Sequence, residues 1–151
     1  MLIDLHRAAF IVAAGLFALG FASSAAADTQ MLKLVEHATT DTVTDTGDED
    51  DSVGDILTFA NPVFDEANKT QLGSDNGWCV RTVVGTAWEC FWTVTLKDGQ
   101  ITVEGPYFDA SDSTLAVTGG TGTYAGATGE MVLHARNPEQ TEYDFSYKLI
   151  R

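Results

Sequence analysis

The chain has 151 residues and is strongly acidic, with 22 Asp and Glu residues against 8 Lys and Arg and a formal net charge of −14 at pH 7. Nucleic acids and anionic membranes bind basic surfaces, so the composition excludes both as partners. Apolar residues make up 44% of the chain, which is enough to build a packed core.

An export signal is predicted at residues 1–27. Arg7 precedes an apolar run from Ala8 to Ala22, and Ala25-Ala26-Ala27 forms a small-residue cleavage site before Asp28. The run is shorter than the roughly 20 residues that a membrane-spanning helix needs. We therefore expect cleavage after Ala27, a secreted or periplasmic protein without a membrane span, and a single domain over residues 28–151.

The remaining chain reads as strands and turns without a helix. Apolar and polar residues alternate with the period of two that is typical of half-buried strands. The predicted strands are 31–38, 55–63, 77–84, 88–97, 100–107, 113–119, 129–136 and 141–150. Eight short antiparallel strands close most economically into an up-and-down β-barrel, because closure removes the exposed sheet edges. A two-sheet sandwich is the alternative all-β architecture.

The first two strands each carry a polar residue on an apolar face. Glu36 shares a face with Leu32 and Leu34, and Asn61 shares one with Leu57 and Phe59. Between the strands, Thr39 to Gly54 is a polar loop rich in aspartate. It is interpreted as a solvated surface loop, with calcium binding over residues 41–55 as the alternative.

The middle of the chain contains two predicted hairpins and both cysteines. Lys97-Asp98-Gly99-Gln100 is typical of a tight turn between strands. A two-residue turn at Val84-Gly85 would pair Val83 with Thr86, Arg81 with Trp88 and Cys79 with Cys90. Export places Cys79 and Cys90 in an oxidising compartment, which favours a disulfide over two buried free thiols. Two thiols and the well-separated His37 and His134 supply too few ligands for metal binding, so we expect no metal.

The stretch from Leu115 to Glu130 contains five glycines: Gly119, Gly120, Gly122, Gly126 and Gly129. A phosphate-binding loop would need a following helix or a Lys-Ser/Thr pair, and neither is present. The glycines therefore indicate a corner between two strands, where positive φ or close backbone approach is required.

Several of these segments resemble one family. The block from Glu89 to His134, with VEGPY ending at Tyr107 and LAVTGGTG beginning at Leu115, resembles the core of plant allene oxide cyclases. The glycine corner is also similar to a motif of dirigent proteins, which share that barrel. Upstream, GDILTFANPVF and NGWCV are similar to the second and third strands of the cyclases.

The resemblance implies a lipocalin-like barrel that uses no cofactor and cyclises or steers a small hydrophobic molecule in an apolar cavity. By the same resemblance, the catalytic glutamate falls on Glu36. Cavity positions fall on Asn61, Cys79 and Tyr107, beside Leu57 and Phe59 of the same second strand.

The residues alone leave two readings of these positions open. A carboxyl group on an inward apolar face has a raised pKa and can move a proton or stabilise developing positive charge. Glu36 could equally be a rim residue bonded to backbone or water, and Asn61 and Tyr107 could be satisfied core groups. His134 is expected to face outward. Two function classes follow: a cofactor-independent cyclase or isomerase, and a non-catalytic barrel that binds a small ligand or, through its outer face, a second copy in a homo-oligomer (dimer or trimer).

Overall fold

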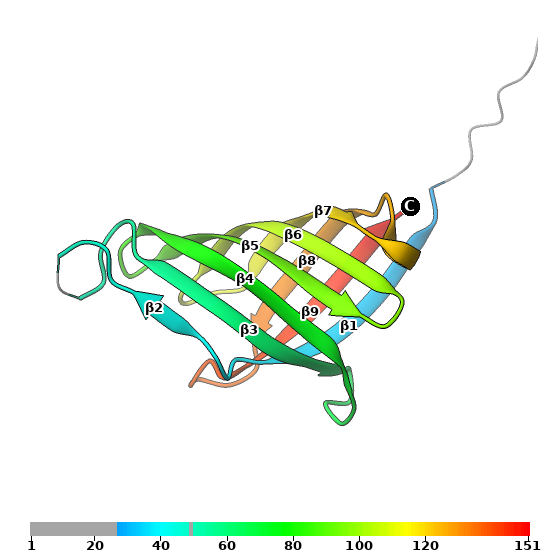
Figure 1. Cartoon of the computed structure of the whole chain (residues 1–151), viewed down its shortest axis with the longest axis horizontal. Helices are drawn as coiled ribbons and strands as arrows, with labels where there is room; N and C mark the ends of the chain where they lie inside the picture. The colour runs from blue at the N-terminus through cyan, green and yellow to red at the C-terminus, as the bar shows by residue number, and fades with distance from the viewer. Residues whose placement is uncertain (1–26, 49) are drawn as a thin grey trace, which may run out of the picture.

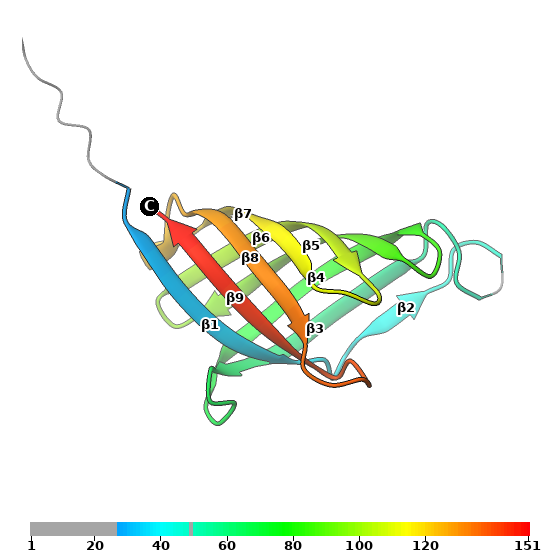
Figure 2. The ribbon, with the colours of Figure 1, turned by 180° about the vertical axis from the view of Figure 1, so that it is seen from behind.

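The structure is a computed structural model that describes residues 27–48 and 50–151. Over these residues it is an all-β barrel of eight antiparallel strands with one short additional strand (Figures 1 and 2). The strands are β1 (Thr29–His37), β2 (Thr42–Thr44), β3 (Ile56–Asp65), β4 (Gln71–Val83), β5 (Ala87–Leu96), β6 (Gly99–Phe108), β7 (Ser113–Gly120), β8 (Thr128–Ala135) and β9 (Glu142–Ile150). The predicted barrel is confirmed, and the sandwich alternative is excluded by its closure.

The barrel closes where β1 pairs with β3. Leu34 lies opposite Asp65 and Glu36 opposite Val63, while the other edge of β1 pairs with β9 along its full length. The other half of β3 pairs with β2, which the polar character of residues 39–54 did not predict. Both β1 and β2 therefore run along one edge of β3, and the chain leaves the barrel wall between them at residues 38–41.

Strand β4 begins at Gln71, six residues before the predicted start at Gly77. The stretch QLGSDN has the composition of a turn, yet Ser74 pairs with Pro62 and Thr95, and Asp75 pairs with Asn61 and Val94. Pairing with a strand on each side overrides the weak local preference of these residues for strands. The correction matters for the site, because it moves Asp75 from a loop into the barrel wall.

The turn between β4 and β5 differs from the predicted two-residue turn. Val83 pairs with Ala87 and not with Thr86, and a register shift at Thr82 restores the predicted pairing of Arg81 with Trp88. Beyond that bulge, Cys79 lies opposite Cys90, and the two residues form the predicted disulfide with their Cα atoms 4.0 Å apart.

The glycine corner is a short 3-10 helix, η1 (Gly122–Tyr124), between β7 and β8. Of the three glycines at its start, Gly122 alone has a positive φ, of 58°. A Cβ on Gly122 would lie 2.3 Å from the carbonyl oxygen of Asp98, whereas one on Gly119 would lie 3.4 Å from Thr102 Oγ1. Within residues 27–48 and 50–151, no helix is long and apolar enough to cross a membrane.

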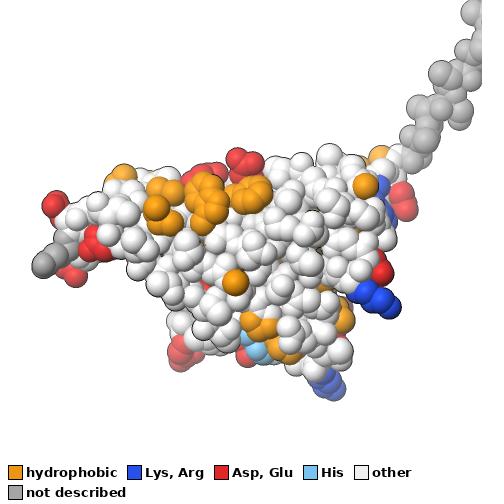
Figure 3. Space-filling model, in the orientation of Figure 1, with side chains coloured by type: hydrophobic (Ala, Val, Ile, Leu, Met, Phe, Trp, Pro, Cys, Tyr) orange, Lys and Arg blue, Asp and Glu red, His pale blue; other side chains and the backbone are white. Residues whose placement is uncertain are grey.

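Inward side chains fill most of the barrel. Aromatic residues from β5 and β9 meet across it, with the ring centroids of Trp92 and Phe145 5.7 Å apart and those of Phe145 and Tyr147 6.4 Å apart. Figure 3 shows hydrophobic side chains gathered on part of the outer surface and acidic ones at the end of the molecule near β2. The exposed large hydrophobic residues of β4 are Leu72, Trp78 and Val83.

Candidate functional site

One cavity opens into the barrel and has a volume of about 40 Å³. Its wall is mostly apolar or aromatic, and its polar groups come from two carboxyls and two tyrosines. The lining residues are Glu36, Asp41, Leu57, Phe59, Cys79, Cys90, Trp92, Tyr107, Leu133, Tyr143 and Phe145. Glu36, Leu57, Phe59, Cys79 and Tyr107, which the sequence singled out, are thus brought together around one space. Because Cys79 is in the disulfide, it offers the cavity no free thiol.

Glu36 lies one residue before the end of β1, at the place where the barrel closes, and is 6% exposed. Its Oε1 atom accepts a hydrogen bond of 2.7 Å from the Asn61 amide. Burial, followed by the negative charge of Asp75, raises the pKa of Glu36 well above its ordinary value, and the Asn61 bond opposes this only in part. Glu36 therefore keeps its proton to a higher pH than an exposed glutamate does.

Asn61 holds Glu36 and the chain after β1 together. Its Oδ1 accepts 3.0 Å hydrogen bonds from the main-chain N–H groups of Thr39 and Thr40 and from the Thr40 hydroxyl. Its Nδ2 donates to Glu36 and, at 2.7 Å, to Asp41 Oδ1. Asn61 is fully buried but is not among the residues that line the cavity. Its observed contacts are those of a residue that positions Glu36.

Asp75 was missed by the sequence analysis because its stretch resembled a turn. It lies opposite Asn61 across the β3–β4 pair, and its Oδ1 accepts a 3.3 Å bond from the Asn61 N–H. The residue is 0% exposed, and its Oδ2 has no hydrogen-bond partner. Burial raises the pKa of Asp75 to about 7. The signal that could have located it is the period of two, since Asp75 and Cys79 share one face of β4.

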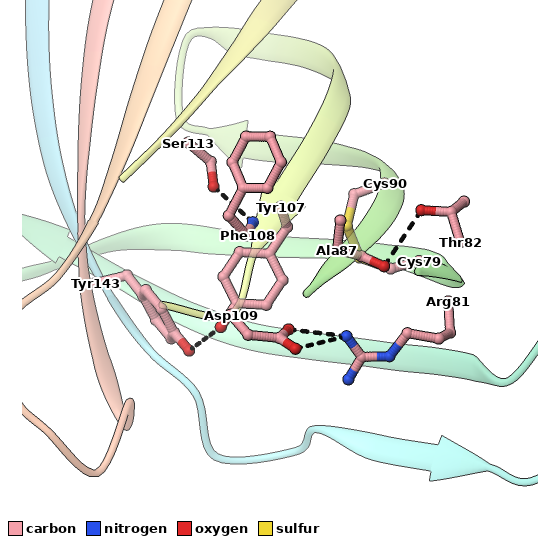
Figure 4. The surroundings of a disulfide bond; sticks show 10 residues. All are labelled: Cys79, Arg81, Thr82, Ala87, Cys90, Tyr107, Phe108, Asp109, Ser113 and Tyr143. Atoms are coloured by element: carbon pink, nitrogen blue, oxygen red, sulfur yellow. Dashed lines mark hydrogen bonds and ion pairs between the residues drawn. A yellow bond between two sulfur atoms is a disulfide. The ribbon is translucent and has the colours of Figure 1, made fainter. Parts of the chain in front are cut away.

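Two tyrosines separate the cavity from a larger outer groove of about 380 Å³. The hydroxyl groups of Tyr107 and Tyr143 are 3.1 Å apart (Figure 4). Tyr107 also donates to Gln140 Oε1 at 2.9 Å. Gln140 in turn donates to the carbonyl oxygen of Asp109. Burial raises the pKa of both tyrosines, so their hydroxyls stay neutral and can donate hydrogen bonds.

Arg81 forms a second buried polar cluster at the barrel end near β2. Its guanidinium donates to both carboxylate oxygens of Asp109, at 2.9 and 2.7 Å (Figure 4). It also donates to Asp51 at 2.6 Å. It also lies 4.0 Å from the ring centroid of Trp88, a cation–π contact. The cluster joins the acidic loop to the β6–β7 loop. No motif or residue spacing in the sequence predicted it.

The remaining polar candidates lie outside the cavity. His134 faces outward as predicted and pairs with Asp112 at 2.7 Å. In the acidic loop, Asp55 accepts main-chain hydrogen bonds from Thr46 and Ser52. Over the described part of the chain, no three His, Cys, Asp or Glu side chains lie in position to hold a metal ion.

An eight-stranded closed barrel with polar groups facing a small apolar cavity defines a class of cyclase-like barrels. The chain belongs to the allene oxide cyclase family, whose sequence profile it matches over residues 30–150. The resemblance inferred from the sequence is thereby confirmed for the family and for the fold.

Solved structures with the same barrel carry several activities. A pyocyanin demethylase is 26% identical, with a TM-score of 0.67 over 77% of this chain and 98% of its own. A pterocarpan synthase dirigent protein is 13% identical, with a TM-score of 0.68 over 82% and 94%. An exo-specific intermolecular Diels-Alderase is 16% identical, with a TM-score of 0.65 over 82% and 99%. The last two similarities show the fold alone.

Proposed function

We propose that this protein is an exported barrel that cyclises or isomerises a small, largely apolar molecule by acid–base chemistry and without a cofactor. The observation that carries the proposal is Glu36, a buried carboxyl group that lines an apolar cavity and whose pKa is raised by that burial. A neutral acid in such a place can protonate a substrate at the pH where free glutamate is ionised.

The proposed chemistry begins with Glu36 as the proton donor. Its O–H bond breaks as a new bond forms to a substrate oxygen or polarised double bond, such as that of an epoxide or polyene. The resulting carboxylate lies beside the cationic substrate and stabilises it until the ring closes or the double bond moves. The carboxylate then recovers a proton from the substrate, so the enzyme returns to its starting state.

The other lining residues supply shape and hydrogen bonds. Leu57, Phe59 and Phe145 offer apolar surface that selects one folded conformer of a flexible substrate and excludes water. Tyr107 and Tyr143 point two neutral hydroxyls at the same space, where they can donate to an oxygen that gains negative charge.

Substrate entry is proposed at the Tyr107–Gln140 contact. Drug-sized ligands occupy sites of about 300–1,000 Å³, whereas the cavity measures about 40 Å³. The outer groove of about 380 Å³ shares Tyr107, Leu133 and Tyr143 with the cavity. Parting of Tyr107 from Gln140 would join the two spaces into a site of suitable size.

The comparisons support an activity of this general kind. The pyocyanin demethylase and the Diels-Alderase are named for reactions of small organic molecules, and both are matched over nearly all of their own chains.

The test is Glu36→Gln, with Glu104→Gln on the exposed face of β6 as the matched control. The glutamine keeps the shape of the side chain but has no acidic proton. We expect turnover of an epoxide or polyene substrate to fall by about 100-fold while ligand binding is retained. The control should retain full turnover. Equal turnover in both variants would contradict the role of Glu36.

One observation favours the second class, a barrel that binds without catalysis. The interior is largely filled, as the small volume of the cavity shows. In that case wild type and Glu36→Gln would bind the same ligand and turn over none of the substrates tested. The exposed Leu72, Trp78 and Val83 on β4 support the accompanying proposal of a homo-oligomer, which native mass spectrometry would test.

Export is supported by the disulfide, since disulfides persist in oxidising compartments. The predicted signal at residues 1–27 lies almost wholly outside the described residues. Intact-mass analysis of the exported protein is expected to give a chain that begins at Asp28; a chain that still begins at Met1 would contradict the proposal.

A further inference from the structure

We propose that Asp75 and Glu36 form one acid pair that shares a proton, with Asp75 as the positioning residue that keeps Glu36 protonated. The pair is a property of the folded protein, but its role in turnover rests on the proposed function. Asp75 is not among the residues that line the cavity, so it can act on a substrate only through Glu36.

Asn61 brings the two carboxyl groups together. Its side-chain amide donates to Glu36 Oε1 at 2.7 Å, and its main-chain N–H donates to Asp75 Oδ1 at 3.3 Å. The two acids come from β1 and β4, on either side of β3. A hydrogen bond between the two carboxyl groups is among the causes that shift the pKa of each.

One oxygen of Asp75 has no hydrogen-bond partner, and a proton shared with Glu36 would satisfy it. Asp75 Oδ2 is buried and has no donor, which is costly for an ionised carboxylate. A proton held between Glu36 and Asp75 would supply the missing donor. It would also remove one of two negative charges that repel each other in a poorly solvated place.

The surroundings of the pair contain no compensating charge among the groups that act on it most strongly. Asp41, from the chain after β1, adds a further negative charge, and Tyr147 from β9 and Tyr107 from β6 are neutral phenols. The pKa values of Glu36 and Asp75 are both raised, in agreement with a retained proton. Because the two groups interact strongly, the pair titrates as a unit.

The consequence for turnover is that Glu36 has its proton available near neutral pH. During an isomerisation the O–H bond of Glu36 breaks and the substrate gains the proton. The charge left behind is then unfavourable because Asp75 lies next to it, and this drives recovery of a proton from the substrate in the second half of the reaction.

The pair is tested by NMR titration of ¹³C-labelled carboxyl groups without any substrate, in wild type, Asp75→Asn, Glu36→Gln and the control Asp112→Asn. Asp112 is a carboxylate that pairs with His134 on the outer surface. In Asp75→Asn we expect the pKa of Glu36 to fall by about one unit or more, since a neighbouring negative charge is lost. In Glu36→Gln the pKa of Asp75 should rise, because Asp75 loses the hydrogen bond from the Glu36 carboxyl group, which lowers its pKa. Asp112→Asn should shift neither.

An unchanged Glu36 titration in Asp75→Asn would overturn the proposal. If Asp75→Asn does not fold, an unchanged Asp75 titration in Glu36→Gln would overturn the proposal instead. The proposed function can fail separately. Coupled titrations together with equal turnover in wild type and Glu36→Gln would support the acid pair but contradict catalysis by Glu36. Loss of turnover in Glu36→Gln without coupled titrations would support Glu36 as the catalytic residue but contradict the acid pair.

Discussion

Asp55 and Asp75 are both almost inaccessible to water, at 1% and 0% exposure, yet their pKa values move in opposite directions. Asp55 lies at the barrel end, where Thr46 and Ser52 of the preceding loop contact it. Main-chain N–H groups of Ser52 and Thr46 hold its carboxylate and lower its pKa. Asp75 lies in the barrel wall with one long hydrogen bond, and its burial raises its pKa. Donors around a carboxyl group, and not low exposure alone, decide its charge.

The same contrast separates Arg81 from Glu36. Arg81 gives the acids of the barrel end a buried cation, which bonds Asp51 and Asp109. Glu36 and Asp75 have an amide, tyrosine hydroxyls and another acid around them. The acids at the barrel end thus bond a cation and join loops, whereas the two acids beside the cavity have raised pKa values.

The largest expected effect concerns the disulfide, which lies on β4 between Asp75 and Arg81. The Cys79→Ala, Cys90→Ala double variant should lose about 3 kcal/mol of unfolding free energy, because the bridge closes a short loop and restricts the unfolded chain. Chemical denaturation under oxidising conditions measures this. The loss of unfolding free energy should be the same at every pH between 5 and 8. A pH-dependent loss would mean that the disulfide also affects the titration of Asp75 or of the acids around Arg81.

The next largest effect is expected for Arg81→Ala. This variant leaves Asp51 and Asp109 at the barrel end without a cation, as Glu36 and Asp75 are in the barrel wall. The loss should be about 2 kcal/mol, less than for a fully buried pair because Asp51 and Asp109 are 35% and 27% exposed. Lys33→Ala, which removes an ion pair whose partners are 53% and 69% exposed, is the control. It should leave the unfolding free energy almost unchanged, because both partners are largely solvated. Similar losses in both variants would refute the special role of Arg81.

A smaller effect, of about 1–2 kcal/mol, is expected for Gly122→Val at the corner before β8. Positive φ and the close Asp98 carbonyl oxygen both oppose a side chain there. Gly119→Val should cost less, because its backbone is ordinary and its nearest contact is 3.4 Å away. Thermal unfolding compares the two variants. Equal thermal midpoints would show that the backbone of the corner adjusts to a side chain at either glycine. Neither substitution should alter the pH dependence of stability that distinguishes Asp55 from Asp75.

The barrel could be predicted from the sequence because alternating strands and turn residues carry its pattern. Thr141 to Ile150, for instance, places Tyr143, Phe145 and Tyr147 on one face, and these residues are buried as β9. The facing cysteines also followed from counting outward from a turn, since a bulge at Thr82 restored the register. The positions of Glu36 and Tyr107 at one cavity follow from the same alternation together with the family resemblance.

The second acid, Asp75, was not predicted, because the turn-like composition of its stretch hid the period of two and its burial depends on distant partners. Ser74, Asp75 and Asn76 are common turn residues, and only pairing with β3 and β5 places them in a strand. The Arg81 cluster likewise joins residues from separate loops. Sequence patterns report which face a residue occupies, whereas the charge of a buried acid depends on neighbours that the whole fold assembles.

The most direct test of this account compares the unfolding free energies of wild type, Asp75→Asn and Asp55→Asn from pH 4 to pH 8. The folded-state pKa of Asp75 is raised from 3.8 to about 7, so the stability it confers is present below pH ~4 and is lost as the pH rises to about 7. Relative to wild type, Asp75→Asn should therefore gain a few kcal/mol across this range. Asp55 has a lowered pKa, so the stability it confers is present above its ordinary pKa and is lost only in acid. The Asp55→Asn difference should thus stay constant from pH 5 to pH 8. A constant Asp75→Asn difference from pH 4 to pH 8 would contradict the claim that the barrel wall holds a protonated acid.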